Sequence, residues 1–181
     1  IAQGEVWQLM NQHNPDITEE DYTRVIKNKT ATLFEAATEI GALLTQQPES
    51  IQHAMAEYGL NLGMGFQIID DLLDYSSHAD TLGKNVGDDL AEGKVTLPLI
   101  VALQRSNETQ KHHIQQAIIH GRIEDLPTIL SALKDTQAIE YTLEQAKHYA
   151  EQARNALQPL PDSSFRQSMM ELISFVVERN Y

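Results

Sequence analysis

The stretch GMGFQIIDDLLDY, residues 63–75, places three carboxylates at the spacing D-D-x-x-D within an otherwise apolar run. In an α-helix, where successive residues are about 100° apart, Asp74 lies about 40° and Asp71 about 100° from Asp70. Gln67 falls between them, at about 60°. The opposite arc of the helix is aliphatic, with Ile68, Ile69, Leu72 and Leu73. The pattern therefore predicts a helix with one face in a core and one acidic face.

The acidic face has two interpretations. Neighbouring carboxylates repel one another and raise each other's pKa, and a hard divalent cation such as Mg²⁺ removes that cost because it prefers oxygen ligands. Gly63 lies on the same face and leaves a gap where a ligand could approach the backbone. Asp70, Asp71 and Asp74 are thus candidate metal ligands. The alternative is a solvated acidic surface, which D-D-x-x-D by itself does not exclude.

The composition indicates one all-α domain over residues 1–181. Hydrophobic residues make up 41% of the chain, and there are 9 Gly and 6 Pro, few for a β-rich protein. The net charge of −13 argues against nucleic acid and anionic membranes as partners, because both need clustered Lys and Arg. The chain has no cysteine, membrane-length apolar run or secretory signal, so we expect a cytoplasmic protein. It begins at Ile1, in sequence typical of the middle of a protein, and we expect a fragment of a longer chain.

Apolar periodicity and turn signals predict seven or eight helices with no convincing strand. Thr18-Glu19-Glu20-Asp21 resembles a capping box with Asp in place of Glu, and the helix that it opens has Tyr22, Val25, Ile26, Leu33 and Phe34 as expected core positions. Residues 76–93 are polar and Gly-punctuated, which indicates a functional loop. The predicted helices cover residues 1–12, 18–45, 50–75, 97–104, 108–120, 123–133, 138–157 and 163–178.

Lysines lie on both sides of the acidic helix in sequence, although the chain has only 13 Lys and Arg. Lys84 and Lys94 belong to the Gly-spaced loop after it, and Lys29 precedes Thr30 in the preceding helix. Lysine is a mobile point charge that suits phosphate oxygens, while the alternative for each is a solvated surface position. Together, the acids, the lysines and the helices that could line an apolar cavity suit a diphosphate ester with an apolar tail.

Other site classes lack support. Residues 70–80 do not have the D-x-[DN]-x-[DN]-G pattern of an EF-hand loop. The seven histidines lack zinc-ligand spacing, and His112, His113 and His120 are expected to be solvated. No P-loop, dinucleotide fingerprint or G-x-S-x-G motif is present.

Several segments, in order along the chain, resemble the trans-polyprenyl diphosphate synthases, and the long-chain bacterial type in particular. The matching segments are the G-E-x-x-Q pattern at residues 4–8, Lys29-Thr30-Ala31, the acidic stretch at 63–74, residues 83–100 and the end at 177–181. The resemblance extends over essentially the whole chain and corresponds to the C-terminal half of that family.

The resemblance implies an all-α isoprenoid synthase fold, a helical bundle around a deep apolar cavity. It implies a prenyltransferase that condenses isopentenyl diphosphate onto an allylic diphosphate such as farnesyl diphosphate. The implied product is a long-chain trans-polyprenyl diphosphate, with octaprenyl diphosphate for quinone side chains as the expected case. A homodimer is also implied.

The resemblance also implies roles for individual residues. Asp70 is expected to bind Mg²⁺, with Asp71 and Asp74 in direct or water-mediated support. Electrostatic stabilisation of the leaving diphosphate and positioning of the substrates would then supply the catalysis. The residues expected to contact or position the allylic diphosphate are Lys29, Thr30, Gln67, Lys84 and Lys94.

The chain departs from the family in one large respect. The family carries a first aspartate-rich motif followed by an arginine pair on an earlier helix, and this sequence has neither. We therefore expect the chain alone to be inactive. The alternative is a non-catalytic subunit or regulatory partner of a prenyltransferase assembly, and an acidic helical interaction module is a weaker third possibility.

Overall fold

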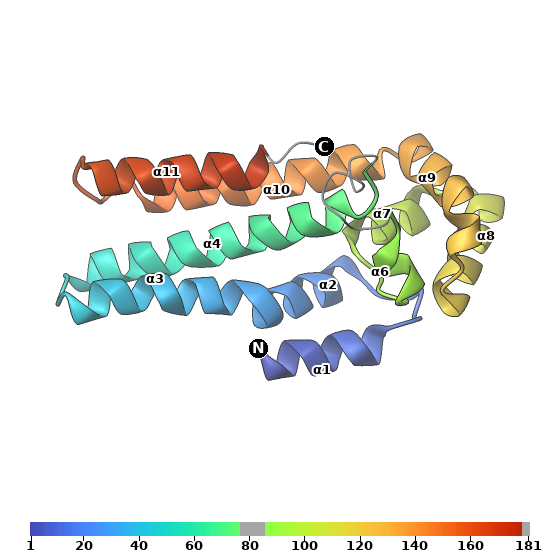
Figure 1. Ribbon diagram of the computed structural model, residues 1–181, viewed down its shortest axis with the longest axis horizontal. Coiled ribbons are helices and arrows are strands. Elements are labelled where there is room, and N and C mark those ends of the chain that lie inside the picture. The colour runs from blue at the N-terminus through green and yellow to red at the C-terminus, as the bar shows by residue number, and fades with distance from the viewer. Residues whose placement is uncertain (77–85, 179–181) are drawn as a thin grey trace.

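The computed structural model describes residues 1–76 and 86–178 (Figure 1). These residues form ten α-helices and no strand. The helices are α1 (Ala2–Asn11), α2 (Glu19–Ile26), α3 (Thr32–Leu44), α4 (Glu49–Leu73), α6 (Asp88–Ala91), α7 (Leu97–Arg105), α8 (Glu108–His120), α9 (Leu126–Asp135), α10 (Ala138–Ala156) and α11 (Ser164–Val177). The all-α prediction is confirmed for these ranges.

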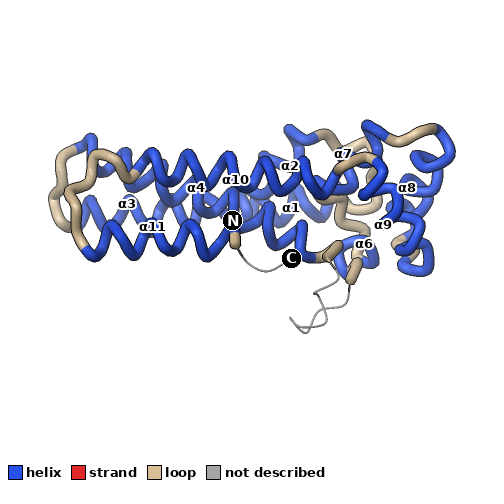
Figure 2. Tube along the Cα trace, turned by 90° about the horizontal axis from the view of Figure 1, so that it is seen from above, coloured by secondary structure: helices blue, strands red, loops and turns tan. Residues whose placement is uncertain are grey.

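The 25-residue helix α4 is the central element of a long bundle. It packs along α3 on one side and along α10 on the other, with α11 beside α10 (Figures 1 and 2). The shorter helices α7, α8 and α9 gather at the end of the bundle that holds the C-terminal part of α4. The acidic stretch of α4 therefore lies where the long bundle meets the short helices.

The main core surrounds the C-terminal part of α4. Ile68 and Ile69 are almost fully buried there, and Leu72 and Leu73 join the same cluster, which confirms the predicted apolar face of this helix. A second cluster around Tyr58 and Leu62 joins α4 to α10 and α11. Burial of these aliphatic side chains provides the main driving force for holding the acidic stretch in place.

The segment between residues 18 and 45 differs from the prediction of one continuous helix. It begins as expected, with a capping box between Thr18 and Asp21, but a π-helical turn, Lys27–Ala31, separates α2 from α3. An inserted residue in such a turn shifts the helical register. Tyr22, before the turn, is buried as expected, whereas Leu33, after it, is 56% exposed. The prediction of Leu33 as a core residue is therefore wrong.

The segment expected as a loop at residues 76–93 contains the short helix α6 in its described part. The remaining predicted helices agree with the structure to within about two residues, apart from a short 3₁₀ turn, Ile123–Asp125, before α9. His112, His113 and His120 lie at exposed positions on α8, as expected. Within the described ranges, no helix has the length and hydrophobicity needed to cross a membrane.

Candidate functional site

A polar cavity of about 420 Å³ opens beside the acidic stretch of α4. Side chains from α1, the π turn, α4, α6 and the segment after α6 line it. Its lining includes six of the residues predicted from sequence, Lys29, Gln67, Asp70, Asp71, Asp74 and Lys94, together with Gln8, Asp88, Asp89 and Glu92. Thr30 adjoins this site through Gln67, and Lys84 lies outside the described residues. The three aspartates of the predicted acidic face thus line one shared hollow.

The charges around the cavity are unbalanced. Six carboxyl groups and two lysines line it, so the side chains alone give the site a strong negative field. A diphosphate would be repelled from such a site unless cations neutralised part of the carboxylate charge. The site therefore favours binding of a cation, and it can bind an anion only together with that cation.

The π turn places Lys29 at the cavity. Its Nζ donates a hydrogen bond of 2.6 Å to Gln8 Oε1 and lies 3.3 Å from Glu5 Oε1, both on α1. Helix α1 can approach this closely because residue 4 is glycine, and a Cβ there would lie 2.4 Å from the Lys29 backbone nitrogen. The segment at residues 4–8, which resembles a family motif, thus fixes the position of the Lys29 side chain.

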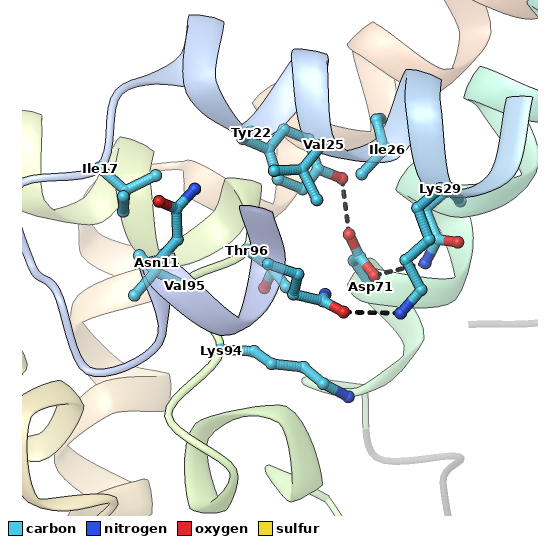
Figure 3. A pocket seen from close by; sticks show the side chains of 12 residues that line it. Asn11, Ile17, Tyr22, Val25, Ile26, Lys29, Asp71, Lys94, Val95 and Thr96 are labelled. Atoms are coloured by element: carbon cyan, nitrogen blue, oxygen red, sulfur yellow. Dashed lines mark hydrogen bonds between the residues drawn. The ribbon is translucent and has the colours of Figure 1, made fainter. Parts of the chain in front are cut away.

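A chain of hydrogen bonds runs from the π turn to the buried side of α4. Thr30 Oγ1 donates to Gln67 Oε1 at 2.7 Å, and Gln67 Nε2 donates to Asp71 Oδ1 at 2.9 Å. The hydroxyl of Tyr22 donates to Asp71 Oδ2 at 2.6 Å. Figure 3 shows the Tyr22 hydroxyl directed at the Asp71 carboxyl group, with a dashed line for this hydrogen bond. Both Asp71 oxygens are therefore bound by protein donors.

Asp71 is buried, and burial raises the pKa of its carboxyl to about 7. The negative charge of Asp89 pushes this pKa in the same direction, while the hydrogen bonds from Tyr22 and Gln67 oppose the rise. The ionised form of the Asp71 carboxyl is therefore costly in the folded protein. A nearby cation would favour its ionised form.

Asp74 joins α4 to α6. Its Oδ2 accepts a hydrogen bond of 3.2 Å from the Asp89 backbone, and its carbonyl oxygen accepts one of 2.9 Å from Gly87 N. Gly87 has a φ of +87°, a left-handed conformation that suits glycine at this turn. These contacts bring Asp88 and Asp89 to the same cavity as Asp70.

Lys94 closes the other side of the cavity. Its Nζ lies 3.0 Å from Asp89 Oδ1 and 2.7 Å from Glu92 Oε2. Partial burial lowers the pKa of Lys94, but its hydrogen bonds to Glu92 and Asp89 outweigh this effect and raise the pKa above its ordinary value. Lys94 is therefore a fixed positive charge at neutral pH.

Gly63 has a different role from the one expected. The sequence predicted a gap beside it for a ligand, but a Cβ at residue 63 would lie 2.7 Å from the Ala31 Cα. The backbone at the end of the π turn thus fills the gap. Gly63 permits the close approach of α4 and the π turn, which brings Thr30 within reach of Gln67.

The donor set suits a hard cation bound jointly with a ligand. Carboxylate oxygens are the groups that Mg²⁺ prefers, and Mg²⁺ is commonly held by one or two carboxylates together with substrate phosphates. Within residues 1–76 and 86–178, no three His or acidic side chains converge closely enough to hold an ion by themselves. This agrees with Asp71 and Asp74 each accepting a protein hydrogen bond.

Sequence reasoning missed several members of the site. Tyr22 was predicted only as a core residue, and Gln8, Asp88, Asp89 and Glu92 were not among the candidate site residues. The last four lie in segments that carried the family resemblance, so that signal could have identified them. Tyr22 had no local signal, since its partner Asp71 lies 49 residues away.

Comparisons with known proteins agree with this geometry. A family model described as Polyprenyl synthetase matches residues 1–135. The octaprenyl diphosphate synthase of Haemophilus influenzae is 42% identical over 182 residues, covering 100% of this chain and 55% of the relative. The crystal structure of a decaprenyl diphosphate synthase from Rhodobacter capsulatus matches with a TM-score of 0.92 and 40% identity, covering 99% of this chain and 56% of that one.

A polyprenyl synthase from Caulobacter crescentus, solved in complex with calcium and isoprenyl diphosphate, also has a TM-score of 0.92, at 39% identity and with 99% and 56% of the two chains covered. The chain spans about half the length of its curated relatives, and the match is to their C-terminal half. The helical arrangement is that of the isoprenoid synthase fold. By the family model and by these relatives, the chain belongs to the polyprenyl synthetase family.

Proposed function

We propose that this chain forms the part of a trans-prenyltransferase that binds the diphosphate group of an allylic substrate through divalent cations. In the proposed reaction, the C–O bond of the allylic diphosphate breaks and diphosphate leaves with the electron pair. The double bond of isopentenyl diphosphate attacks the allylic carbon to form a C–C bond, and a proton is then lost. The relatives, named as octaprenyl and decaprenyl diphosphate synthases, support this reaction class.

The observation that carries the proposal is the cavity lined by six carboxyl groups and two lysines. Mg²⁺ bound there would neutralise the leaving diphosphate, and Asp70 is the proposed ligand, with Asp74 and Asp71 in direct or water-mediated support. The Caulobacter crescentus relative was solved with calcium and isoprenyl diphosphate, which supports this pairing of a divalent cation with a diphosphate.

The remaining residues orient the substrate. Lys29, held by Gln8 and Glu5, and Lys94, held by Asp89 and Glu92, present fixed positive charges to the diphosphate oxygens. Thr30 and Gln67 position the same group through their shared hydrogen bond. Lys84 remains a proposed third contact.

The finer parts of the proposal rest on the family. We propose a long-chain product, with farnesyl diphosphate as the allylic substrate and octaprenyl diphosphate as the product for quinone side chains. We further propose a cytoplasmic homodimer, with this chain inactive when separated from the region that carries the first aspartate-rich motif. The alternative is a non-catalytic subunit of a prenyltransferase assembly.

The test is an assay of the complete synthase that contains this chain, with Mg²⁺, farnesyl diphosphate and radiolabelled isopentenyl diphosphate. Wild type should form labelled polyprenyl diphosphate. Asp70→Ala should lower turnover by orders of magnitude with little change in the free energy of unfolding, because the side chain faces the cavity. Asp135→Ala, an exposed acid on α9, is the matched control and should leave turnover unchanged.

Two outcomes would count against the proposal. Near-normal turnover by Asp70→Ala would show that Asp70 is not a metal ligand needed for the reaction. Absence of activity in the complete wild-type protein, together with activity on addition of a second polypeptide, would favour the subunit alternative. Product length is read from the same assay by chromatography of the dephosphorylated products.

A further inference from the structure

Tyr22 is a buried polar side chain for which the proposed chemistry has no role. It is 5% exposed, and within residues 1–76 and 86–178 its hydroxyl has one recorded hydrogen-bond partner, Asp71 Oδ2 of the acidic motif. Burial and the neighbouring Asp71 charge raise the pKa of Tyr22 well above its ordinary value, so its hydroxyl keeps its proton and acts as a donor. A tyrosine that served only to fill the core could be replaced there by phenylalanine without loss.

The bond from Tyr22 changes what Asp71 can do. With Tyr22 on Oδ2 and Gln67 on Oδ1, the Asp71 carboxylate is held toward α2 and the protein interior. The Gln67 amide is fixed in turn, because its nitrogen must face Asp71 while its oxygen faces Thr30. One tyrosine hydroxyl thus completes a hydrogen-bond chain that crosses from α2 to α4 and back to the π turn.

We infer that Tyr22 is a positioning residue of the diphosphate site, which fixes Asp71 and, through it, the orientation of the Gln67 amide. This inference rests on the proposed function of the cavity. Tyr22 touches neither cation nor substrate in this scheme. Its effect is to hold the Asp71 carboxylate toward α2, so that Asp70 makes the direct cation contact at the cavity wall, Asp71 supports it through water, and Gln67 presents one defined face.

Removal of the Tyr22 hydroxyl would release the Asp71 carboxylate and the Gln67 amide from their fixed orientations. In Tyr22→Phe, Asp71 keeps the hydrogen bond from Gln67 to Oδ1 but loses the one to Oδ2. A buried acceptor without a donor is costly, so the Asp71 carboxylate should turn toward other partners. The available direction is the cavity, where Asp71 would compete with the diphosphate oxygens for the cation and release the Gln67 amide. Both changes alter the site for the diphosphate while leaving the volume of the aromatic ring in the core unchanged.

The first experiment compares Tyr22→Phe with Tyr58→Phe in the complete synthase. Tyr58 is the matched control, since it is 2% exposed and donates a 3.2 Å hydrogen bond to the Met169 carbonyl, away from the acidic motif. Tyr22→Phe should raise the KM for the allylic diphosphate about tenfold, the usual effect of one hydrogen bond to a charged group. The KM for isopentenyl diphosphate should stay within about twofold. Tyr58→Phe should lower stability without changing either constant.

A second readout does not depend on turnover. Calorimetric titration of the complete synthase with Mg²⁺ in the presence of inorganic diphosphate measures cation binding directly. Tyr22→Phe should weaken this binding about tenfold, and Tyr58→Phe should leave it at the wild-type value. Equal Mg²⁺ affinity in Tyr22→Phe and wild type would overturn the inference.

A double-mutant cycle separates positioning from packing. If Tyr22 acts through Asp71, its replacement should have little further effect on Mg²⁺ affinity once Asp71→Asn is present. Additive effects of the two substitutions would contradict the inference. Failure of this inference can be told apart from failure of the proposed function. If the proposed function is wrong, the wild-type synthase is inactive. If only the inference about Tyr22 is wrong, the wild-type synthase is active and Tyr22→Phe binds Mg²⁺ as tightly as wild type.

Discussion

Gly63→Ala tests the close approach between α4 and the π turn that organises the site. The added Cβ would lie 2.7 Å from Ala31 Cα, 3.1 Å from Ala31 Cβ and 3.2 Å from Phe34 Cβ, whereas ordinary contacts are 3.4–4 Å. Relief of the shortest contact requires the two backbones to separate by at least about 0.7 Å. The hydrogen bond between Thr30 and Gln67, now 2.7 Å, would then lengthen beyond the usual range of an O–H···O bond.

The expected loss of stability follows from two opposing effects. Overpacking against a backbone costs up to about 3 kcal/mol, and replacement of glycine by alanine within a helix returns up to about 1 kcal/mol. Gly63→Ala should therefore lower the free energy of unfolding by about 2 kcal/mol. Gly41→Ala on α3 is the matched control, because nothing lies within 4 Å of its Cβ position. It should raise the free energy of unfolding by about 0.5 kcal/mol.

Urea denaturation followed by circular dichroism measures both variants on the same scale. Similar m-values would show that the free energies are comparable. The reasoning is refuted if Gly63→Ala is as stable as Gly41→Ala, since the π turn would then have moved away from α4 without cost. Crystal structures of the variant should show the Thr30–Gln67 distance increased.

Two further predictions concern the neighbours of the cavity. Gly4→Ala places a Cβ 2.4 Å from Lys29 N, so it should detach α1 from the π turn and raise the hydrogen-exchange rate of residues 2–11 severalfold; unchanged exchange would argue against this contact. Because the folded pKa of Asp71, about 7, exceeds its ordinary value of 3.8, the folded protein retains a proton that the unfolded chain releases, and metal-free stability should fall as pH rises from about 4 to 7. Asp71→Asn should flatten this fall, which urea titrations in EDTA at several pH values measure, and an equally steep fall in the variant would contradict the assignment.

The helices of this protein follow from local patterns. The capping box at Thr18 and the aliphatic arc of residues 68–73 are each patterns among residues close in sequence. Apolar periodicity therefore located α4, α7, α8 and α10 closely. The same reasoning failed at Leu33, because a π turn adds one residue to the register and the periodicity does not reveal it.

The site divides in the same way. The spacing of Asp70, Asp71 and Asp74 predicted an acidic face, the pattern of basic residues suggested Lys29 as a phosphate contact, and the family resemblance added the role of Thr30. The spacing alone could not rank the three aspartates, and the expectation that Asp70 is the main ligand came from the resemblance. The structure distinguishes them through partners: Asp71 accepts two side-chain hydrogen bonds in the interior, and Asp74 accepts a backbone one from α6.

The sequence by itself determined the helical class, the acidic face and the family, since periodicity, spacing and motifs are properties of short stretches of chain. Tertiary structure alone decided that Gly63 receives the π-turn backbone, that Lys29 is held from α1 and that Tyr22 reaches Asp71. These contacts join residues that are far apart in the chain, and only the packing of helices on a shared core brings them together.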